Sequence, residues 1–120
     1  MTLIATCHCG KTRIALPEAP THATECNCTY CSKSGGLWAY YDPDSVTVTE
    51  NEGADYAPSG YNHHHFCTTC GCTTYGLSPA WSLGDTEVPK TMKFAVNARL
   101  LDDFDIGALV VEKIDGRNLW

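Results

Sequence analysis

The run Cys26-Asn27-Cys28-Thr29-Tyr30-Cys31 places three cysteines within six residues. Thiolate sulfur is a preferred ligand of zinc, and structural zinc sites usually have four ligands in a tetrahedron. The run supplies three ligands and contains no obvious fourth. Zinc sites with three protein ligands leave one coordination position for water or substrate, as in catalytic zinc. The run therefore indicates a metal site that can support chemistry, provided that no other residue closes it.

The remaining cysteines fall into two groups, within Cys7-His8-Cys9-Gly10 and Phe66-Cys67-Thr68-Thr69-Cys70-Gly71-Cys72. The second motif has the form of a zinc-ribbon knuckle, in which a tight turn directs two thiolates at one metal and glycine relieves the backbone. One natural partition places Cys7, Cys9, Cys67 and Cys70 around a closed structural zinc. Such a site would join two segments that lie about sixty residues apart in the sequence.

Two interpretations of Cys72 remain open at this level. As the fourth ligand of the central group it would close that site, whereas a free buried cysteine behaves as a small hydrophobic residue. The triplet His63-His64-His65 also offers imidazole ligands, but consecutive side chains of a strand alternate between faces, so at most two can share a site. We expect structural or solvent-facing roles for the three histidines.

Length and composition predict one domain over residues 1–120, and the charge indicates no nucleic-acid or membrane partner. The formal charge of -6 opposes non-specific binding to nucleic acid or anionic lipid. The apolar stretch Met1–Thr6 is too short for the apolar region of a signal peptide. We therefore expect a cytoplasmic protein, a compartment where clustered cysteines bind metal or catalyse more often than they form disulfides.

Short strands separated by turns account for most of the chain, and no long amphipathic helix is indicated. Thr29–Ser34 is expected to form one helical turn that ends at Gly35-Gly36, and Ser78–Pro89 a long loop. The predicted fold is mainly β, a set of small antiparallel sheets around a structural zinc, with few helical turns. Strands are predicted in the hairpin Thr2–Ala15 and in His22–Cys26, Leu37–Tyr41, Ser45–Glu50, Asp55–Ala57, Asn62–Phe66, Thr73–Leu77, Met92–Leu101 and Leu109–Ile114.

The ordered set of motifs resembles the glutathione-dependent formaldehyde-activating enzyme family, which also contains centromere protein V. The resemblance rests on the three cysteine motifs, on Gly35-Gly36-Leu37-Trp38, and on the segments Asn97–Asp102 and Asp115–Asn118. It covers nearly the whole chain in the expected order. The chain departs from the commoner members at His63–His65, where a basic residue often precedes the Phe-Cys motif.

The resemblance implies a β-tent fold and two zinc ions per chain. One would be structural, on Cys7, Cys9, Cys67 and Cys70, and one catalytic, on Cys26, Cys28 and Cys31. The implied partners are a small thiol such as glutathione and a small aldehyde, and the implied activity is that of a carbon–sulfur lyase or synthase giving S-(hydroxymethyl)glutathione from glutathione and formaldehyde. Two alternatives are the same fold acting on another small thiol adduct, and a non-catalytic zinc-stabilised binding module.

Substrate contacts near the central run are expected from the residues that follow it. Three thiolates carry a charge of -3 against +2 for zinc, so a further anionic ligand needs nearby donors. Ser32 and Lys33 are candidates for that role because they directly follow Cys31. Arg99 is expected to form an ordinary surface ion pair or one with Asp102, rather than to bind a carboxylate of the substrate.

Overall fold

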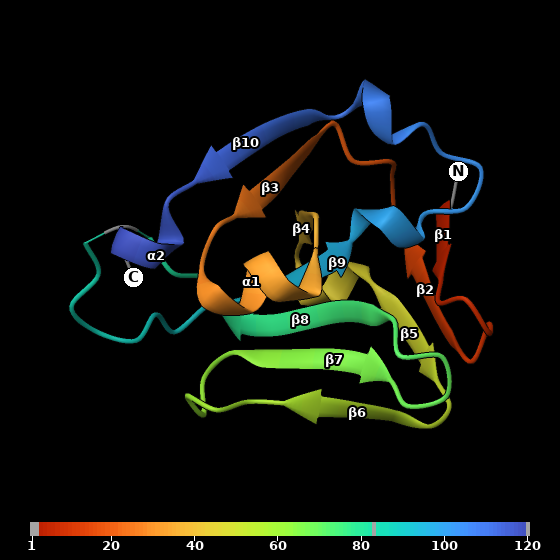
Figure 1. The fold of residues 1–120 in the computed structure, drawn as a ribbon, viewed down its shortest axis with the longest axis horizontal. Coiled ribbons are helices and arrows are strands. Elements are labelled where there is room, and N and C mark those ends of the chain that lie inside the picture. Colours follow the sequence, from red (N-terminus) through yellow and green to blue (C-terminus); the bar gives the residue numbers. More distant parts are fainter. Residues whose placement is uncertain (1–2, 83, 120) are drawn as a thin grey trace.

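The computed structural model describes residues 3–82 and 84–119. It contains two β-sheets and few helical turns, which confirms the mainly β prediction (Figure 1). The small sheet has the order β1-β2-β5. Its strands are β1 (Leu3–Thr6), β2 (Thr12–Leu16) and β5 (Thr47–Glu50). Thr2, the first residue of the predicted hairpin, lies outside the described residues.

The large sheet has seven strands in the order β10-β3-β4-β9-β8-β7-β6. Six neighbouring pairs make up this sheet, and five of them are antiparallel. The pair β3–β10 is parallel, unlike the all-antiparallel arrangement expected from the sequence. The strands are β3 (His22–Cys26), β4 (Trp38–Tyr41), β6 (Gly53–Tyr56), β7 (His63–Cys67), β8 (Thr73–Pro79), β9 (Met92–Asn97) and β10 (Val110–Ile114).

The core lies between the two sheets and is built from small and branched side chains. Ile14 and Leu16 from β2 are 1% exposed, and they pack in one cluster with Phe94 and Val96 of β9. The alternating burial along β2 and β9 places these side chains on one face of each strand, which is the periodicity that a half-buried strand requires. Burial of this apolar surface holds the small sheet against the large one.

Short helical turns complete the fold. One of them includes Ser45, so the strand predicted from Ser45 starts at Thr47, and another shortens the strand predicted from Met92. The 3-10 turns are η1 (Pro43–Ser45), η2 (Ala98–Leu100) and η3 (Ile106–Ala108), and the helices are α1 (Thr29–Ser34) and α2 (Gly116–Leu119). The predicted strand Met92–Leu101 is too long, because β9 ends at Asn97. The Asn97 side chain caps η2 by accepting a hydrogen bond from the Arg99 amide at 3.2 Å.

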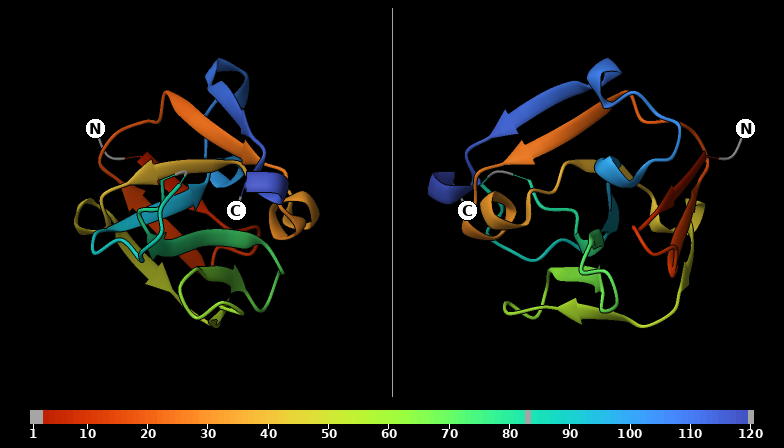
Figure 2. Two further views of the ribbon diagram at one scale, coloured as in Figure 1. Left: turned by 90° about the vertical axis from the view of Figure 1, so that its left-hand side faces the viewer. Right: turned by 45° about the vertical axis from the view of Figure 1, so that its right-hand side comes forward.

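Two arms of the large sheet separate on either side of α1 (Figures 1 and 2). Strands β3 and β10 form one arm, and β6, β7 and β8 form the other. The separation starts where β3 leaves β4, since Thr24 and Trp38 are the paired residues between these two strands. Helix α1 follows β3 directly and fills the space between the arms. Among the described residues, no helix is long and apolar enough to span a membrane.

Candidate metal centres and active-site cavity

The eight cysteines are free of disulfides, and seven of them form two groups that can hold a metal ion. In each group the ligand atoms lie within 4.8 Å of one another. The first group contains Cys7, Cys9, Cys67 and Cys70, and the second contains Cys26, Cys28 and Cys31. The folded chain therefore brings together the same sets of sulfur atoms that the spacing of the motifs predicts.

Two tight turns deliver the four-cysteine group. Gly10 and Gly71 each follow a cysteine pair with positive φ angles of 83° and 80°, a conformation that glycine adopts without a steric penalty. The Sγ atom of Cys9 lies 3.7 Å from that of Cys7 and 3.5 Å from that of Cys67. Cys67 is fully buried. A cluster of this kind supplies four soft ligands, which is the complete ligand set of a structural zinc, although Cys9 itself is exposed.

Glu52 joins the two turns outside the sulfur cluster. Its carboxylate accepts hydrogen bonds from Lys11 Nζ at 2.6 Å and from Thr69 Oγ1 at 2.7 Å. Its carbonyl oxygen accepts from the Thr68 amide at 2.9 Å. Lys11 follows the first cysteine pair and Thr69 lies within the second, so Glu52 fixes their relative position. The Lys11 ammonium and Thr69 hydroxyl hold the pKa of Glu52 below its usual value.

Cys72 lies beside the four-cysteine group and not in the three-cysteine group. Its carbonyl oxygen accepts a hydrogen bond from the Cys67 amide at 3.0 Å. The amide of Cys72 is the largest influence on Cys70 and lowers the pKa of that thiol to about 5. The Cys72 thiol has the opposite shift: the His8 backbone acts to lower its pKa, but burial and the neighbouring Cys70 outweigh this effect and raise it. This position disfavours the interpretation in which Cys72 is the fourth ligand of the three-cysteine group.

The three-cysteine group is assembled where β3 passes into α1. Cys26 ends β3, and Cys28 is the N-cap residue of α1. The Sγ atom of Cys28 accepts a hydrogen bond from the Cys31 amide at 3.3 Å, in the way that an N-cap oxygen usually does. The Sγ atom of Cys26 accepts from the Cys28 amide at 3.4 Å. Both bonds favour the thiolate form of the accepting sulfur.

The pKa shifts of these three thiols reflect competition between burial and hydrogen bonding. Burial raises the pKa of Cys26 and raises that of Cys31 strongly. At Cys28 burial acts in the same direction, but the Cys31 amide and the adjacent thiols outweigh it and lower the pKa. Three thiolates this close repel one another, so a bound cation is needed to keep all of them ionised. The donor set therefore fits a thiophilic divalent metal such as zinc.

Asn27 fixes the loop between Cys26 and Cys28 to the C-terminal segment. Its Nδ2 atom donates to Asp115 Oδ1 at 2.9 Å, and its Oδ1 atom accepts from the Arg117 amide at 3.0 Å. Its backbone carbonyl accepts from Ser32 Oγ at 2.9 Å. Hydrogen bonds of this kind orient metal ligands from outside the ligand sphere. The sequence pattern did not single out Asn27, because the C-x-C-x-x-C spacing specifies only the cysteines and allows any residue between them.

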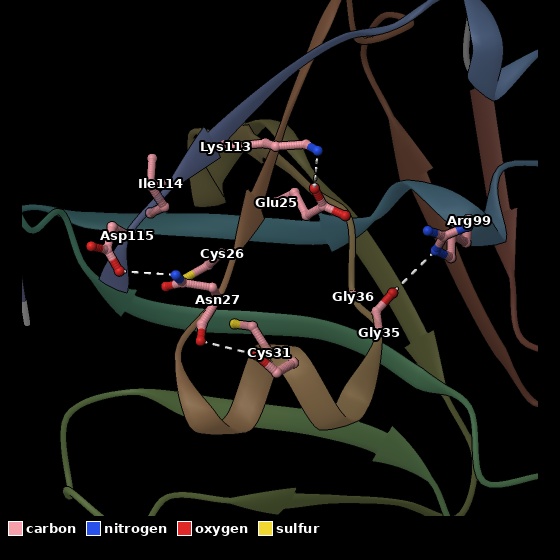
Figure 3. Close-up of a pocket in the computed structure, with 11 residues that line it drawn as sticks. Glu25, Cys26, Asn27, Cys31, Gly35, Gly36, Arg99, Lys113, Ile114 and Asp115 are labelled. Carbon is pink, nitrogen blue, oxygen red and sulfur yellow. Dashed lines mark hydrogen bonds and ion pairs between the residues drawn. The ribbon is translucent and has the colours of Figure 1, made fainter. Parts of the chain in front are cut away.

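A cavity of about 490 Å³ opens beside the three-cysteine group (Figure 3). Cys26 and Cys31 line it, whereas Cys28 does not. The other lining residues come from the ends of β3, α1, β10 and η2, and are Glu25, Asn27, Ser32, Gly35, Gly36, Arg99, Lys113, Ile114 and Asp115. Two of the three cysteines, Cys26 and Cys31, therefore border a space large enough for a small ligand.

Ser32 and Lys33, the predicted substrate contacts, face different surroundings. Ser32 lines the cavity beside Cys26 and Cys31, but its hydroxyl already donates to Asn27. Lys33 lines a second cavity of about 560 Å³, together with Tyr30, Tyr56 and His64. The structure thus places Ser32 near the three-cysteine group as part of its support, and it places Lys33 in a separate cavity.

The three histidines of the triplet all have structural partners in the described part of the chain. His63 Nδ1 lies 2.6 Å from Asp55 Oδ2, and the ring of His65 stacks on Tyr75 with centroids 4.2 Å apart. The ring of His64 stacks on Tyr30 of α1 at 3.8 Å. No histidine joins either cysteine group within these described residues. His64 instead helps to fix α1 against the arm formed by β6, β7 and β8.

Two polar residues hold the far end of α1 and were only partly indicated by the sequence. Asn97 is 6% exposed, accepts from the Leu37 amide at 3.3 Å and donates to the Thr73 carbonyl at 2.9 Å. Arg99 donates from Nε to the Gly35 carbonyl at 3.0 Å. The predicted ion pair of Arg99, on the surface or with Asp102, is wrong: no described carboxylate lies within 4.0 Å of its nitrogens, and the Asp102 carboxylate accepts from Thr6 Oγ1. The segment Asn97–Asp102 thus contributes to the cavity as well as to the fold.

The comparisons with known proteins agree with this architecture. A crystal structure of a Rhodobacter sphaeroides protein matches with a TM-score of 0.71 and 24% sequence identity, and the match covers 92% of this chain and 99% of that one. This likeness shows a shared fold. No curated protein matches the chain. Residues 2–102 match the family described as glutathione-dependent formaldehyde-activating enzyme. Because the match spans most of the chain, the protein belongs to the glutathione-dependent formaldehyde-activating enzyme family.

Proposed function

We propose that this protein catalyses the reversible addition of glutathione to formaldehyde at a zinc ion held by Cys26, Cys28 and Cys31. The observation that carries the proposal is the group of three cysteine sulfurs, two of whose residues border a cavity. No fourth Cys, His, Asp or Glu ligand atom joins it within 4.8 Å in the described chain. Cys26 and Cys31 line a cavity, so an incoming thiol can approach the group from that side. Membership of the family supports the choice of substrates.

The reaction is an addition that changes no oxidation state overall. The S–H bond of the thiol breaks, and the sulfur forms a bond to the carbonyl carbon of formaldehyde. The π electron pair of the carbonyl moves to oxygen, which takes up a proton, and S-(hydroxymethyl)glutathione results. A zinc ion held by Cys26, Cys28 and Cys31 would supply Lewis acidity and would lower the pKa of the substrate thiol.

The residues around the group hold the three sulfurs in place. The Cys28 and Cys31 amides donate to Cys26 and Cys28, which favours ionised sulfur before substrate arrives. Asn27 links this loop to Asp115 through its side chain. The Ser32 hydroxyl donates to the Asn27 backbone carbonyl and so joins the loop to α1. Such preorganisation reduces the rearrangement that the site needs when the reactants bind. Cys7, Cys9, Cys67 and Cys70 hold a second, structural zinc in this proposal.

Exchange spectroscopy with ¹³C-formaldehyde and glutathione tests the proposal directly. The zinc-loaded protein should increase the rate of interconversion between free aldehyde and adduct above the uncatalysed rate, at a pH where the spontaneous reaction is slow. Cys28→Ser should return the rate to that background while the protein stays folded. Elemental analysis should find two zinc ions per chain, one of them lost more readily to a chelator.

The outcome against the proposal is equally clear. Two tightly held zinc ions with no thiol-dependent acceleration would support a zinc-stabilised binding module instead. Acceleration with other thiols but not with glutathione would support the addition of a thiol to formaldehyde and would contradict glutathione as the substrate. Each result can be read from the same protein preparation, because zinc content and exchange rate are measured independently.

A further inference from the structure

One positively charged side chain lines the cavity without an acidic partner. Arg99 lies in η2, at the end of the cavity formed by Gly35 and Gly36 (Figure 3). Its Nε atom donates to the Gly35 carbonyl at 3.0 Å, and its own amide is held by Asn97 Oδ1. The guanidinium is thus fixed at the C-terminal end of α1, where the exposed carbonyl groups favour a cation.

The charge of Arg99 is not neutralised within the described residues. No carboxylate there lies within 4.0 Å of its nitrogens, and Asp102 is engaged by Thr6. Its terminal nitrogens make no hydrogen bond to another described residue. A guanidinium presents its donors as a planar fork that matches the two oxygens of a carboxylate. The unused part of this fork is suited to an anionic ligand.

The other charges that line the cavity already have partners. Lys113 Nζ lies 3.7 Å from Glu25 Oε2. The Asp115 carboxylate accepts from Asn27 and Asn118, and the Asn118 amide is the main reason that its pKa is held below the usual value. Among the described lining residues, Arg99 is therefore the cation that has no acidic partner and remains for an anionic ligand.

Arg99 and Cys31 are connected through Gly35 at the end of α1. Gly35 follows Cys31 by four residues, and its amide donates to the Cys31 carbonyl at 3.0 Å. Four residues of helix correspond to a rise of roughly 6 Å. An extended peptide spans about 3.3–3.6 Å per residue. Cys31 and Arg99 line the same cavity, and this rise is shorter than two extended residues, so the spacing is compatible with a ligand whose carboxylate lies one residue beyond the residue that carries the sulfur.

We propose that Arg99 binds the C-terminal carboxylate of the thiol substrate, so that the cavity selects peptides ending in a cysteinyl-glycine-like unit over neutral thiols. This inference rests on the proposed function and adds a specificity-determining residue to it. The sequence suggested Lys33 as the cation that contacts the substrate, but Lys33 lines a different cavity, and we assign this role to Arg99.

The test compares glutathione with its glycyl monoethyl ester, in which the relevant carboxylate is neutral. Hydrogen bonds to charged groups typically contribute enough for a roughly 10- to 100-fold effect on binding. The wild-type zinc-loaded protein should therefore show a KM for the ester roughly 10- to 100-fold above that for glutathione. In Arg99→Gln the KM for glutathione should rise to that of the ester, while the KM for the ester stays constant. Arg99→Lys should restore part of the difference.

Calorimetric binding of S-methylglutathione and its glycyl ester gives a second readout that does not depend on turnover. Arg13→Gln is the matched control, because Arg13 is an exposed residue of β2 that does not line the cavity. Thermal unfolding shows whether Arg99→Gln remains folded. An equal loss for acid and ester in Arg99→Gln, or no loss for either, overturns the inference. A wild-type protein without turnover overturns the proposed function, and the binding measurement still decides the role of Arg99.

Discussion

Asn27 and Asp115 are hydrogen-bonded at 2.9 Å although 88 residues separate them in the sequence. This contact connects the middle of the three-cysteine run to the segment that follows β10. It lies partly outside the region matched by the family, which ends at residue 102. The C-terminal segment is therefore part of the support of the site in this chain.

The contact predicts an effect of Asp115→Ala on metal binding at the three-cysteine group. Loss of a partner that orients metal ligands typically lowers metal affinity by roughly 10- to 100-fold. We expect the more labile zinc to be lost at a lower chelator concentration, while the zinc of Cys7, Cys9, Cys67 and Cys70 is retained. Competition with a chromophoric chelator measures both. Asp44→Ala, at an exposed position outside the cavity lining, is the control, and equal effects of the two changes would contradict the prediction.

The two cysteine groups should differ in their contribution to folding. Cys67 is fully buried and links β7 to the turn of Cys7 and Cys9, so Cys67→Ser should abolish cooperative unfolding or lower its midpoint strongly. The apparent free energy of structural zinc binding in small domains, about 10–16 kcal/mol, makes a large effect reasonable. Cys28→Ser should leave the fold intact and remove one zinc ion.

Circular dichroism during thermal unfolding, combined with zinc analysis, separates the two cases. A similar loss of folding in Cys67→Ser and Cys28→Ser would argue against the division into a structural and a catalytic group. Retention of both zinc ions in Cys28→Ser would argue against the three-cysteine ligand set. Neither result is expected from the geometry of the two groups.

Gly36 should not tolerate a side chain. A Cβ atom at this position would lie 2.2 Å from the Trp38 ring, and Trp38 is 5% exposed and cannot move freely. Overpacking of this kind costs about 1–3 kcal/mol of stability. We expect Gly36→Ala to lower the unfolding midpoint and to weaken zinc binding beside it, since Gly36 lines the cavity with Cys31.

A double-mutant cycle checks the physical cause of that effect. Trp38→Phe removes part of the ring that the new methyl group meets. The double variant Gly36→Ala/Trp38→Phe should therefore be more stable than the sum of the single changes predicts. Simple additivity in denaturant unfolding would show that the steric contact with Trp38 is not the reason for the loss.

Stability should fall in mild acid because of His64. Burial lowers the pKa of His64 from its ordinary value of 6.5, with the neighbouring His63 and His65 acting in the same direction. Between the unfolded value and this lower folded value, the unfolded chain binds a proton that the folded chain does not. Unfolding therefore becomes more favourable as the pH falls below about 6.5. Above that pH, His64 is neutral in both the folded and the unfolded chain, and it does not reduce the free energy of unfolding.

His64→Phe retains an aromatic ring to stack on Tyr30 and removes the titrating group. We expect a smaller dependence of the unfolding free energy on pH between about 7.5 and the onset of zinc release, with zinc content followed in parallel. His22→Gln is the control, because His22 is exposed and bonded only to the adjacent Thr21 in the described structure. An unchanged pH dependence in His64→Phe would contradict the assignment.

The sequence by itself determined the local elements and the three cysteine motifs, but it left the place of Cys72 open. The spacing within Cys26–Cys31 and within Cys67–Cys70, together with glycines that adopt positive φ, is local information, so the turns could be predicted from the residues alone. The alternation of apolar residues predicted the strands for the same reason. The strand after Met92 was predicted too long because the side chain of Asn97 ends it through hydrogen bonds to distant parts of the chain.

Only the tertiary structure decided which side chains face the three-cysteine group. Asn27 meets Asp115, and Arg99 meets Gly35, through contacts between segments 88 and 64 residues apart, and no local pattern encodes such pairs. The parallel pairing of β3 with β10 brings the C-terminal segment to the site. Residues next to Cys31 are separated for a related reason: successive side chains of α1 point in different directions, so Ser32 lines one cavity and Lys33 the other.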